Sequence, residues 1–251
     1  MICILVEKTE VRSQKKEDVM RFHFKHFSLN HDRSTMKVGT DAVLLGAWVG
    51  VKPTDWVLDI GTGCGVLPLM LAQKGIAKVH AVDLDEASVY EAANNFEASQ
   101  WRDQLFAFHA DIRRFNMGCQ YDLIISNPPF FINSYKSDTD RKNQARHTDT
   151  SLTFMELVCS AKRLLKPDGR FALVLPERES HDFIPIAEKY HLHVHKRQNI
   201  IPIEHREANR VNLELRFGKP ESVEETTLVM RHADNSFTEA YNEVVKDFYL
   251  G

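Results

Sequence analysis

The sequence lacks an apolar run that approaches the roughly 18 residues needed to cross a membrane. It also lacks the features of a secretory signal. Residues 1–11 contain a short apolar patch, but no basic start, no long apolar core and no small-residue cleavage site. The 43% hydrophobic and 27% charged residues are typical of an ordinary globular protein. We therefore expect a cytoplasmic protein with no membrane partner.

Cysteine is scarce, and its four residues are far apart and form no CxxC pair. This spacing argues against a disulfide framework and against a structural zinc site. Three histidines, His191, His193 and His195, share one face of a predicted strand and are the other candidates for metal ligands. We interpret them as outward-facing polar positions that alternate with Leu192 and Val194. We expect no bound metal.

Positive charge is not in excess, because the net charge is −3. The charges are uneven, however: residues 1–40 and 189–219 hold more Lys and Arg than Asp and Glu, whereas residues 221–251 are acidic. Such runs are commonly solvated surface. If the protein handles nucleic acid, its positive surface must be local.

Predicted strands alternate with predicted helices, and there is no internal repeat. Strand, loop and helix units are predicted at 53–75 and 78–99, strands at 105–115, 121–126 and 170–177, and helices at 152–169 and near 180–190. The apolar strands indicate a mainly parallel sheet that is covered on both faces. Two late strands, at 191–203 and 211–219, are expected to form an antiparallel pair at one edge.

The two ends of the chain are expected to add smaller elements. Residues 22–29 alternate apolar and polar side chains, which suits a hairpin arm. Residues 37–49 predict a turn and a helix with Thr40 or Asp41 as its N-cap. The acidic and aromatic stretch at 238–250 predicts a final helix that packs back on the body.

A glycine loop, DIGTGCG (59–65), follows a predicted strand and opens a predicted helix. Its glycines permit tight turns and close approach of a ligand to the backbone. Asp83 ends the next strand, 22 residues after Gly61, where a carboxylate can accept both hydroxyls of a ribose. Asp111 ends the third strand and is placed to accept from an adenine amino group. The G-x-G-x-G spacing counts against a nicotinamide enzyme, which usually has G-x-G-x-x-G, but does not exclude one.

The fourth predicted strand ends in YDLIISNPPF (121–130). Pro128 and Pro129 have no N–H, so the backbone there offers only carbonyl acceptors. Asn127 adds a side-chain oxygen, and Phe130 adds a flat apolar face. A planar base with an amino group suits this pattern, because its two amino hydrogens can go to the Asn127 oxygen and the Pro128 carbonyl. Two fixed acceptors would aim the nitrogen lone pair at a methyl donor, which is catalysis by positioning and electrostatics.

These motifs resemble those of class I S-adenosylmethionine-dependent methyltransferases, and NPPF resembles the signature of members that methylate amino groups. A wider stretch, residues 22–48, together with LDIGTGCGVL (58–67), ISNPPFF (125–131) and the DFYL ending, resembles the bacterial tRNA1(Val) (adenine-37-N6)-methyltransferase family. The resemblance covers Arg21 to Leu250. KVGTDAVLLG (37–46) is its most family-specific part, whereas the glycine loop is shared by the whole superfamily.

The resemblance implies an α/β, Rossmann-like fold: a mainly parallel seven-stranded sheet with an antiparallel edge hairpin and helices on both faces. It implies S-adenosyl-L-methionine as cofactor. The residues expected to bind the cofactor are Lys37, Thr40, Asp59, Gly61, Gly63, Gly65, Asp83, Leu84, Asp111, Ile112 and Asn127. The residues expected to hold the target base are Asn127, Pro128, Pro129 and Phe130.

The expected RNA contacts lie in three places. Asp41 would lie beside the target base by resemblance. The loop at 131–150 follows the NPPF motif, holds four Lys or Arg residues, and suits a lid over a flipped nucleotide. A second basic loop is predicted at 196–210. The basic residues expected to contact RNA phosphates are Arg141, Lys142, Arg146, Lys196, Arg197, Arg206 and Arg210.

We expect one methyltransferase domain over residues 21–251, which acts as a monomer. Its parts would be a lid segment over substrate and cofactor at 21–52, a catalytic core at 53–219 and a tail at 220–251. Residues 1–20 lie outside the resemblance and are expected to form an extension, and the original start could be Met20.

The resemblance implies adenosine 37 in the anticodon loop of a valine tRNA as the substrate. Guanine N2 in ribosomal RNA and a glutamine amide in a protein release factor keep the same chemistry and stay open. A protein-methylating relative would be expected to carry a recognition domain ahead of the glycine loop. An inactive binding module is a further alternative, which the intact NPPF motif disfavours.

Overall fold

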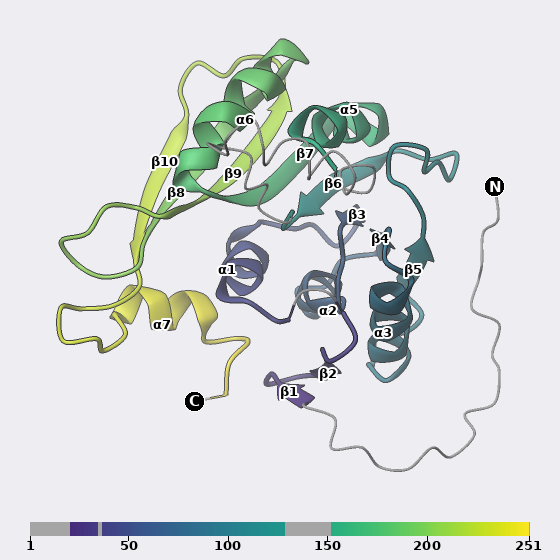
Figure 1. Ribbon diagram of the computed structural model, residues 1–251, viewed down its shortest axis with the longest axis horizontal. Helices are drawn as coiled ribbons and strands as arrows, with labels where there is room; N and C mark the ends of the chain where they lie inside the picture. The colour runs from purple at the N-terminus through teal and green to yellow at the C-terminus, as the bar shows by residue number, and fades with distance from the viewer. Residues whose placement is uncertain (1–20, 35–36, 129–151, 251) are drawn as a thin grey trace, which may run out of the picture.

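The computed structural model describes residues 21–34, 37–128 and 152–250. Its described part contains a sheet of eight strands in the order β10-β8-β9-β7-β6-β3-β4-β5 (Figure 1). The strands are β3 (Trp56–Ile60), β4 (Lys78–Asp83), β5 (Leu105–His109), β6 (Tyr121–Ser126), β7 (Leu165–Pro176), β8 (Leu192–Ile201), β9 (Arg210–Phe217) and β10 (Glu224–Val229). Only β9 runs antiparallel to its neighbours in this sheet. The mainly parallel α/β sheet is therefore confirmed.

The predicted number of strands was wrong, because β10 adds an eighth strand at the edge. The antiparallel pair of β8 and β9 exists, but β10 pairs in parallel with β8 and covers its outer side. Residues 224–227 of β10 are polar and exposed. Because β10 has no apolar run, the sequence analysis assigned its residues to an acidic tail.

Helices cover both faces of the sheet (Figure 1). One face carries α1 (Thr40–Trp48), α2 (Val66–Gln73), α3 (Glu86–Glu97) and α7 (Glu239–Val245), and the other carries α5 (Phe154–Leu164) and α6 (Glu177–Lys189). Successive residues of β6 enter opposite cores: Leu123 and Ile125 lie in the first, and Ile124 lies in the second. The continuous apolar run of a doubly covered strand follows from this alternation.

Three helix boundaries differ from the prediction. The final helix, α7, ends at Val245 and not at residue 250. Helix α1 begins at Thr40, but its N-cap is Gly39 and no side chain caps it, so the predicted cap at Thr40 or Asp41 was wrong. Helix α5 ends at Leu164, before the predicted end at 169, because β7 begins at the next residue. Its start is fixed by a capping box between Thr153 and Glu156.

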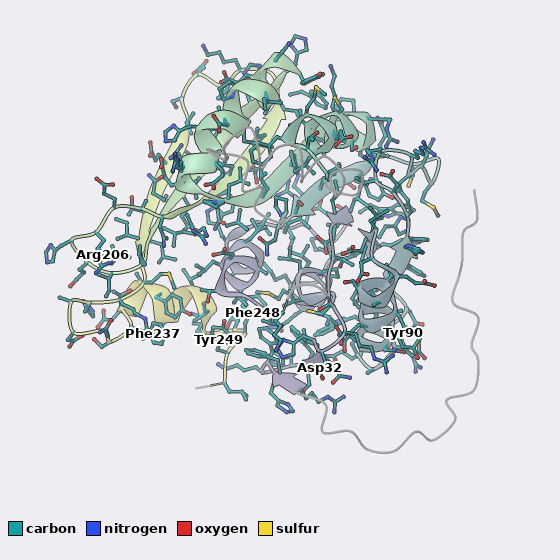
Figure 2. All side chains as sticks on the ribbon, in the orientation of Figure 1. Asp32, Tyr90, Arg206, Phe237, Phe248 and Tyr249 are labelled. Carbon is teal, nitrogen blue, oxygen red and sulfur yellow. The ribbon has the colours of Figure 1, made fainter. Side chains whose placement is uncertain are left out.

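The N-terminal hairpin packs against the C-terminal tail. Strands β1 (Arg21–His23) and β2 (Ser28–Asn30) form the predicted hairpin. The rings of Phe24 and Tyr249 stack with centroids 5.8 Å apart, and the Lys25 N–H donates to the Phe248 carbonyl at 2.8 Å. Phe248 and Tyr249 are labelled in Figure 2. Burial raises the pKa of Tyr249 to about 12. The aromatic ending thus closes the core formed by the hairpin and α2.

Within the ranges that the structure describes, no helix has the length and apolar character needed to span a membrane.

Candidate active site

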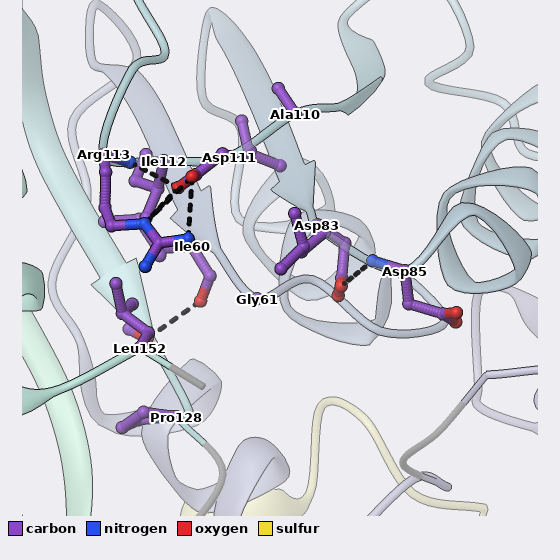
Figure 3. A pocket seen from close by; sticks show the side chains of 13 residues that line it. Ile60, Gly61, Asp83, Asp85, Ala110, Asp111, Ile112, Arg113, Pro128 and Leu152 are labelled. Carbon is purple, nitrogen blue, oxygen red and sulfur yellow. Dashed lines mark hydrogen bonds and ion pairs between the residues drawn. The ribbon is translucent and has the colours of Figure 1, made fainter. Parts of the chain in front are cut away.

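A cavity of about 380 Å³ opens at the carboxyl edge of the parallel strands (Figure 3). Parallel strands place their carboxyl ends together, so residues distant in sequence meet there. Five predicted cofactor residues, Gly61, Asp83, Leu84, Asp111 and Ile112, line it with Pro128 of the NPPF motif. The rest of its lining is Ile60, Val82, Asp85, Ala110, Arg113, Ser126 and Leu152.

The glycine loop connects β3 to α2 on one side of this cavity. Gly61, Gly63 and Gly65 all have positive φ, a conformation that only glycine adopts readily. A Cβ at Gly65 would lie 2.5 Å from Cε1 of Phe96, so this position also needs glycine to pack against α3. The loop is held in place because the Gly63 N–H donates to Asp83 at 2.9 Å.

Asp83 joins the glycine loop to the turn that follows β4. Its Oδ2 accepts from the Gly63 N–H, and its Oδ1 accepts from the Asp85 N–H at 3.0 Å. Asp85 in turn caps α3 by accepting from the Ser88 N–H at 2.9 Å. A carboxylate has about four acceptor sites, so two remain on Asp83 for the hydroxyls of a ribose.

Asp111 is held by an arginine that sequence analysis missed. The Arg113 Nε donates to both Asp111 oxygens, at 2.8 and 2.9 Å, and its guanidinium forms an ion pair with Glu156 at 3.2 Å. The hydrogen bond from Arg113 holds the pKa of Asp111 below its ordinary value. Asp111 therefore stays ionised as an acceptor, and Figure 3 shows Arg113 bonded to it. Through Glu156, Arg113 also connects Asp111 to the capping box of α5.

Asp59 lies at the end of β3 and is fully buried. Neither of its oxygens, nor the hydroxyl of nearby Thr62, has a hydrogen-bond partner among the described residues. Burial is the main cause that raises the pKa of Asp59 to about 7. The nearby Thr62 hydroxyl lowers this pKa, and the negative charge of Asp83 raises it. An ionised Asp59 would thus be favoured by a cationic ligand group near the glycine loop.

The chain leaves β6 through Asn127 between two residues that line the cavity, Ser126 and Pro128. The Ser126 hydroxyl donates to the Ile60 carbonyl at 2.8 Å and joins β6 to β3. The Asn127 Oδ1 is buried and has no hydrogen-bond partner within the described part of the chain. Pro128 is buried and lines the cavity. Pro129 and Phe130 lie outside the described residues.

The N-terminal segment approaches the same edge of the sheet. Asp41, in the first turn of α1, forms an ion pair with Arg210 at 2.9 Å, and Arg210 pairs with Pro176 at the carboxyl end of β7. Asp41 and Arg210, two of the residues predicted to contact RNA, thus form an ion pair with each other. Lys37 and Thr40 are exposed and do not line the cavity.

The second basic loop was predicted wrongly. Lys196 and Arg197 lie in β8 and Arg210 begins β9, so the loop itself spans only residues 202–209. Lys196 forms an ion pair with Glu224 at 2.7 Å. Arg206 is exposed in the loop. The loop is shorter than predicted because β8 and β9 pair from Leu192 with Phe217 as far as Ile200 with Arg210.

The Arg197 guanidinium is also engaged, since it lies 3.3 Å from the Glu177 carboxylate. The first basic loop, with Arg141, Lys142 and Arg146, lies outside the described residues.

Only two of the three histidines lie in the predicted strand. His191 precedes β8 with a φ of 69°. His193 and His195 are less buried than Leu192 and Val194, as predicted, and the register of β8 shifts at His195, between Val194 and Lys196. The His195 Nε2 is hydrogen-bonded to the Gly218 carbonyl at 2.9 Å. Among the residues described, no group of three His, Cys, Asp or Glu side chains is arranged to hold a metal ion.

The sequence matches the family described as "Methyltransferase small domain" over residues 34–194. It is 40% identical to a tRNA1(Val) (adenine(37)-N6)-methyltransferase from Pectobacterium carotovorum, over 91% of this chain and 93% of the relative. It is 41% identical to the protein of the same name from Phocaeicola vulgatus, over 91% of this chain and 97% of the relative.

Solved structures share the fold. A predicted O-methyltransferase from Agrobacterium tumefaciens matches with a TM-score of 0.65 and 15% identity, over 83% of this chain and 96% of that one. A 16S rRNA N2 G1207 methyltransferase from T. thermophilus, in complex with AdoMet and guanosine, matches with a TM-score of 0.54 and 24% identity. That match covers 76% of this chain and 47% of the other.

Proposed function

Because the chain belongs to the tRNA1(Val) (adenine(37)-N6)-methyltransferase family, we propose that it methylates N6 of adenosine 37 in a valine tRNA. As a member of that family it is an S-adenosylmethionine-dependent methyltransferase. The observation that supports the substrate best is the buried Asn127 oxygen, which has no hydrogen-bond partner among the described residues and directly precedes Pro128, a residue that lines the cavity. This arrangement of acceptors suits an amino group and does not suit a carbonyl oxygen.

The cavity fits the cofactor because it offers acceptors where S-adenosylmethionine carries donors. When bound, S-adenosylmethionine supplies a methyl group activated by its sulfonium charge. Asp83 would accept the ribose hydroxyls, and Asp111 with Ile112 and the neighbouring Leu84 would hold the adenine. The unpartnered oxygens of Asp59 suit the ammonium end of the methionine, and the positive-φ glycines of residues 61–65 leave room for it.

The chain's part in the reaction is to hold the target amine. The Asn127 side-chain oxygen and the Pro128 carbonyl would each accept one N6 hydrogen, which favours a pyramidal nitrogen and directs its lone pair. Phe130 and Pro129 would support the base, with Phe130 stacked on the ring. The nitrogen becomes acidic when it is methylated, so water can take its proton and no strong base is required. Catalysis would therefore come from positioning and electrostatics.

The proposed RNA contacts divide between two roles. Asp41 and Arg210, which form an ion pair at the sheet edge, would shape the entry to the base pocket. Arg141, Lys142, Arg146 and Arg206 would contact tRNA phosphates, as would Lys196 and Arg197 if their acidic partners release them.

We further propose that residues 21–251 act as one domain in a monomer. In it, Lys37 and Thr40 of the 21–52 segment would lie over the cofactor and the substrate. A tRNA substrate would place the reaction in the cytoplasm.

The function is tested by deleting the gene and analysing the strain's valine tRNA. Nuclease fragments that contain position 37 are measured by mass spectrometry. We expect N6-methyladenosine in the parent, unmodified adenosine in the deletion strain, and restoration by a plasmid copy. Persistence of the modification in the deletion strain would refute the proposed substrate, and loss of a methyl group from guanine N2 or from a protein glutamine would identify another one.

A further inference from the structure

A buried carboxylate on α3 holds a turn at the surface. Glu91 is 4% exposed. Its Oε1 accepts from the N–H groups of Asp32 and Arg33, at 2.9 and 3.0 Å, and its Oε2 accepts from the Ser34 N–H at 2.8 Å. Burying a charge is costly unless hydrogen bonds compensate it. The three bonds compensate Glu91 and at the same time fix the position of the turn at 32–34.

A second residue on α3 fixes the chain just before this turn. Asn95 exchanges two hydrogen bonds with the backbone of Asn30, at 2.9 and 2.8 Å. Its amide also donates to the Cys64 carbonyl in the glycine loop at 2.9 Å. The same helix therefore holds the glycine loop and the turn at 32–34 in a fixed relation.

The turn presents a cation beside an exposed aromatic ring. The Arg33 guanidinium lies 5.5 Å from the centroid of the Tyr90 ring, Arg33 is exposed and Tyr90 is 46% exposed. Figure 2 shows Tyr90 and Asp32, which precedes Arg33, near the lower margin of the molecule, and neither Arg33 nor Tyr90 is among the residues of the two cores. The position of this pair is tightly fixed although neither side chain contributes to a core.

Tyr90 belongs to the part of α3 that is nearest in sequence to the cavity lining. Helix α3 starts directly after Asp83 and Asp85, which line the cavity, and Tyr90 lies in its first turns. The chain that follows the turn at 32–34 leads to Lys37 and Asp41. An RNA strand that enters the cavity edge would thus pass this surface.

Other exposed cation–aromatic pairs are less suited to this role. The Lys78 amine lies 4.6 Å from the Trp56 ring centroid, but both residues begin their strands, at the opposite edge of the sheet. The Phe237 ring is covered on one side by Arg231, at 3.9 Å, and stacks on Tyr241 at 4.5 Å. Its ring faces are already occupied.

We propose that Arg33 and Tyr90 form a contact surface for the unpaired tRNA strand that flanks the target adenosine. Arg33 supplies a charge for a phosphate, and Tyr90 supplies a ring on which an unpaired base stacks. Glu91 is a positioning residue that holds the backbone of Arg33. This inference rests on the proposed function, because it takes the anticodon loop as the ligand.

Binding of a fluorescent anticodon stem-loop of valine tRNA tests the surface. Tyr90→Ala and Arg33→Ala are each expected to weaken binding about tenfold, within the range for loss of one base stack or phosphate contact. Affinity for S-adenosylmethionine should stay within about twofold. Arg33→Ala should also reduce the slope of log K against log salt by about 1, because one phosphate contact is lost. A purely structural role would not change this slope.

The matched control is the pair at the opposite edge. Trp56→Ala removes an aromatic ring and Lys78→Ala removes a positive charge at the edge of the sheet opposite the cavity. Both variants should bind the stem-loop as tightly as the wild type. Glu91→Gln keeps the size of the side chain but turns one acceptor into a donor facing an N–H. It should weaken stem-loop binding and spare cofactor binding.

The possible results distinguish failure of the proposed contact surface from failure of the proposed function. Unchanged stem-loop affinity and salt slope in Tyr90→Ala and Arg33→Ala, with the wild-type protein methylating adenosine 37, would overturn the surface and leave the function standing. Equal losses in the Trp56 and Lys78 variants would overturn it too. Absence of methyl transfer by the wild-type protein would refute the proposed function and this inference with it.

Discussion

Replacing Asn127 with alanine is expected to lower the rate of methyl transfer by about 10²–10³-fold, the loss seen when one preorganised hydrogen-bonding group is removed from a transition state. The fold should survive, because the Asn127 oxygen has no hydrogen-bond partner among the described residues. Truncation therefore leaves no protein donor unsatisfied. Affinity for S-adenosylmethionine should change little, since the amide is assigned to the target amine.

Single-turnover kinetics and thermal unfolding of the purified variant measure both effects. Asn127→Asp keeps an acceptor at the same place and should recover part of the rate. Asn212→Ala is the matched control, because the Asn212 side-chain oxygen is also buried and without a partner among the described residues. Asn212 is fully buried, and its nitrogen donates to Gln198 at 3.0 Å. We expect Asn212→Ala to lose about 1–3 kcal/mol of stability and to keep its activity. A fully active Asn127→Ala would mean that NPPF is only a proline turn.

Replacing Asp83 with alanine is expected to weaken S-adenosylmethionine binding by about 10- to 150-fold. This corresponds to about 1.5–3 kcal/mol for lost charge-assisted hydrogen bonds. Two causes combine, because the carboxylate is assigned to the ribose and also holds the Gly63 and Asp85 N–H groups, at 2.9 and 3.0 Å. The glycine loop would lose its link to β4 in the same variant.

Calorimetric titration of folded protein with the cofactor measures this loss. Asp83→Asn keeps one acceptor and should bind with intermediate affinity. Asp85→Ser is the control, since it removes a neighbouring carboxylate from the same cavity wall and retains a residue suited to cap α3. Its affinity should stay within about threefold of the wild type. Equal affinities for Asp83→Ala and the wild type would remove Asp83 from the cofactor site.

The parts of the fold that were predicted correctly are those set by local patterns. The apolar run of β6 follows from burial on both faces, and the glycine loop follows from the backbone conformation that residues 61–65 require. Because the carboxyl ends of parallel strands meet at one edge, the convergence of Asp83, Asp111 and Pro128 on one cavity could also be predicted.

The features that were missed depend on tertiary contacts. Strand β10 begins with four exposed polar residues, and nothing in the sequence indicates that they pair with β8. Arg113 follows Asp111 by two residues, but nothing in the sequence indicates that Glu156 would hold its other end. The ion pair between Asp41 and Arg210 joins residues 169 positions apart. Interactions at such separations have no periodic pattern in the chain.

The most direct measurement uses purified protein, S-adenosylmethionine and transcripts of a valine tRNA that differ only at position 37. Adenine has an amino group where guanine has a carbonyl, and a carbonyl would face the acceptors of Asn127 and Pro128. Mass spectrometry of nuclease fragments should find one methyl group on N6 of adenosine 37, and none at position 37 of the A37→G transcript. Methylation of guanosine at that position, or of a different nucleotide in both transcripts, would contradict the assignment of this site to the adenine amino group.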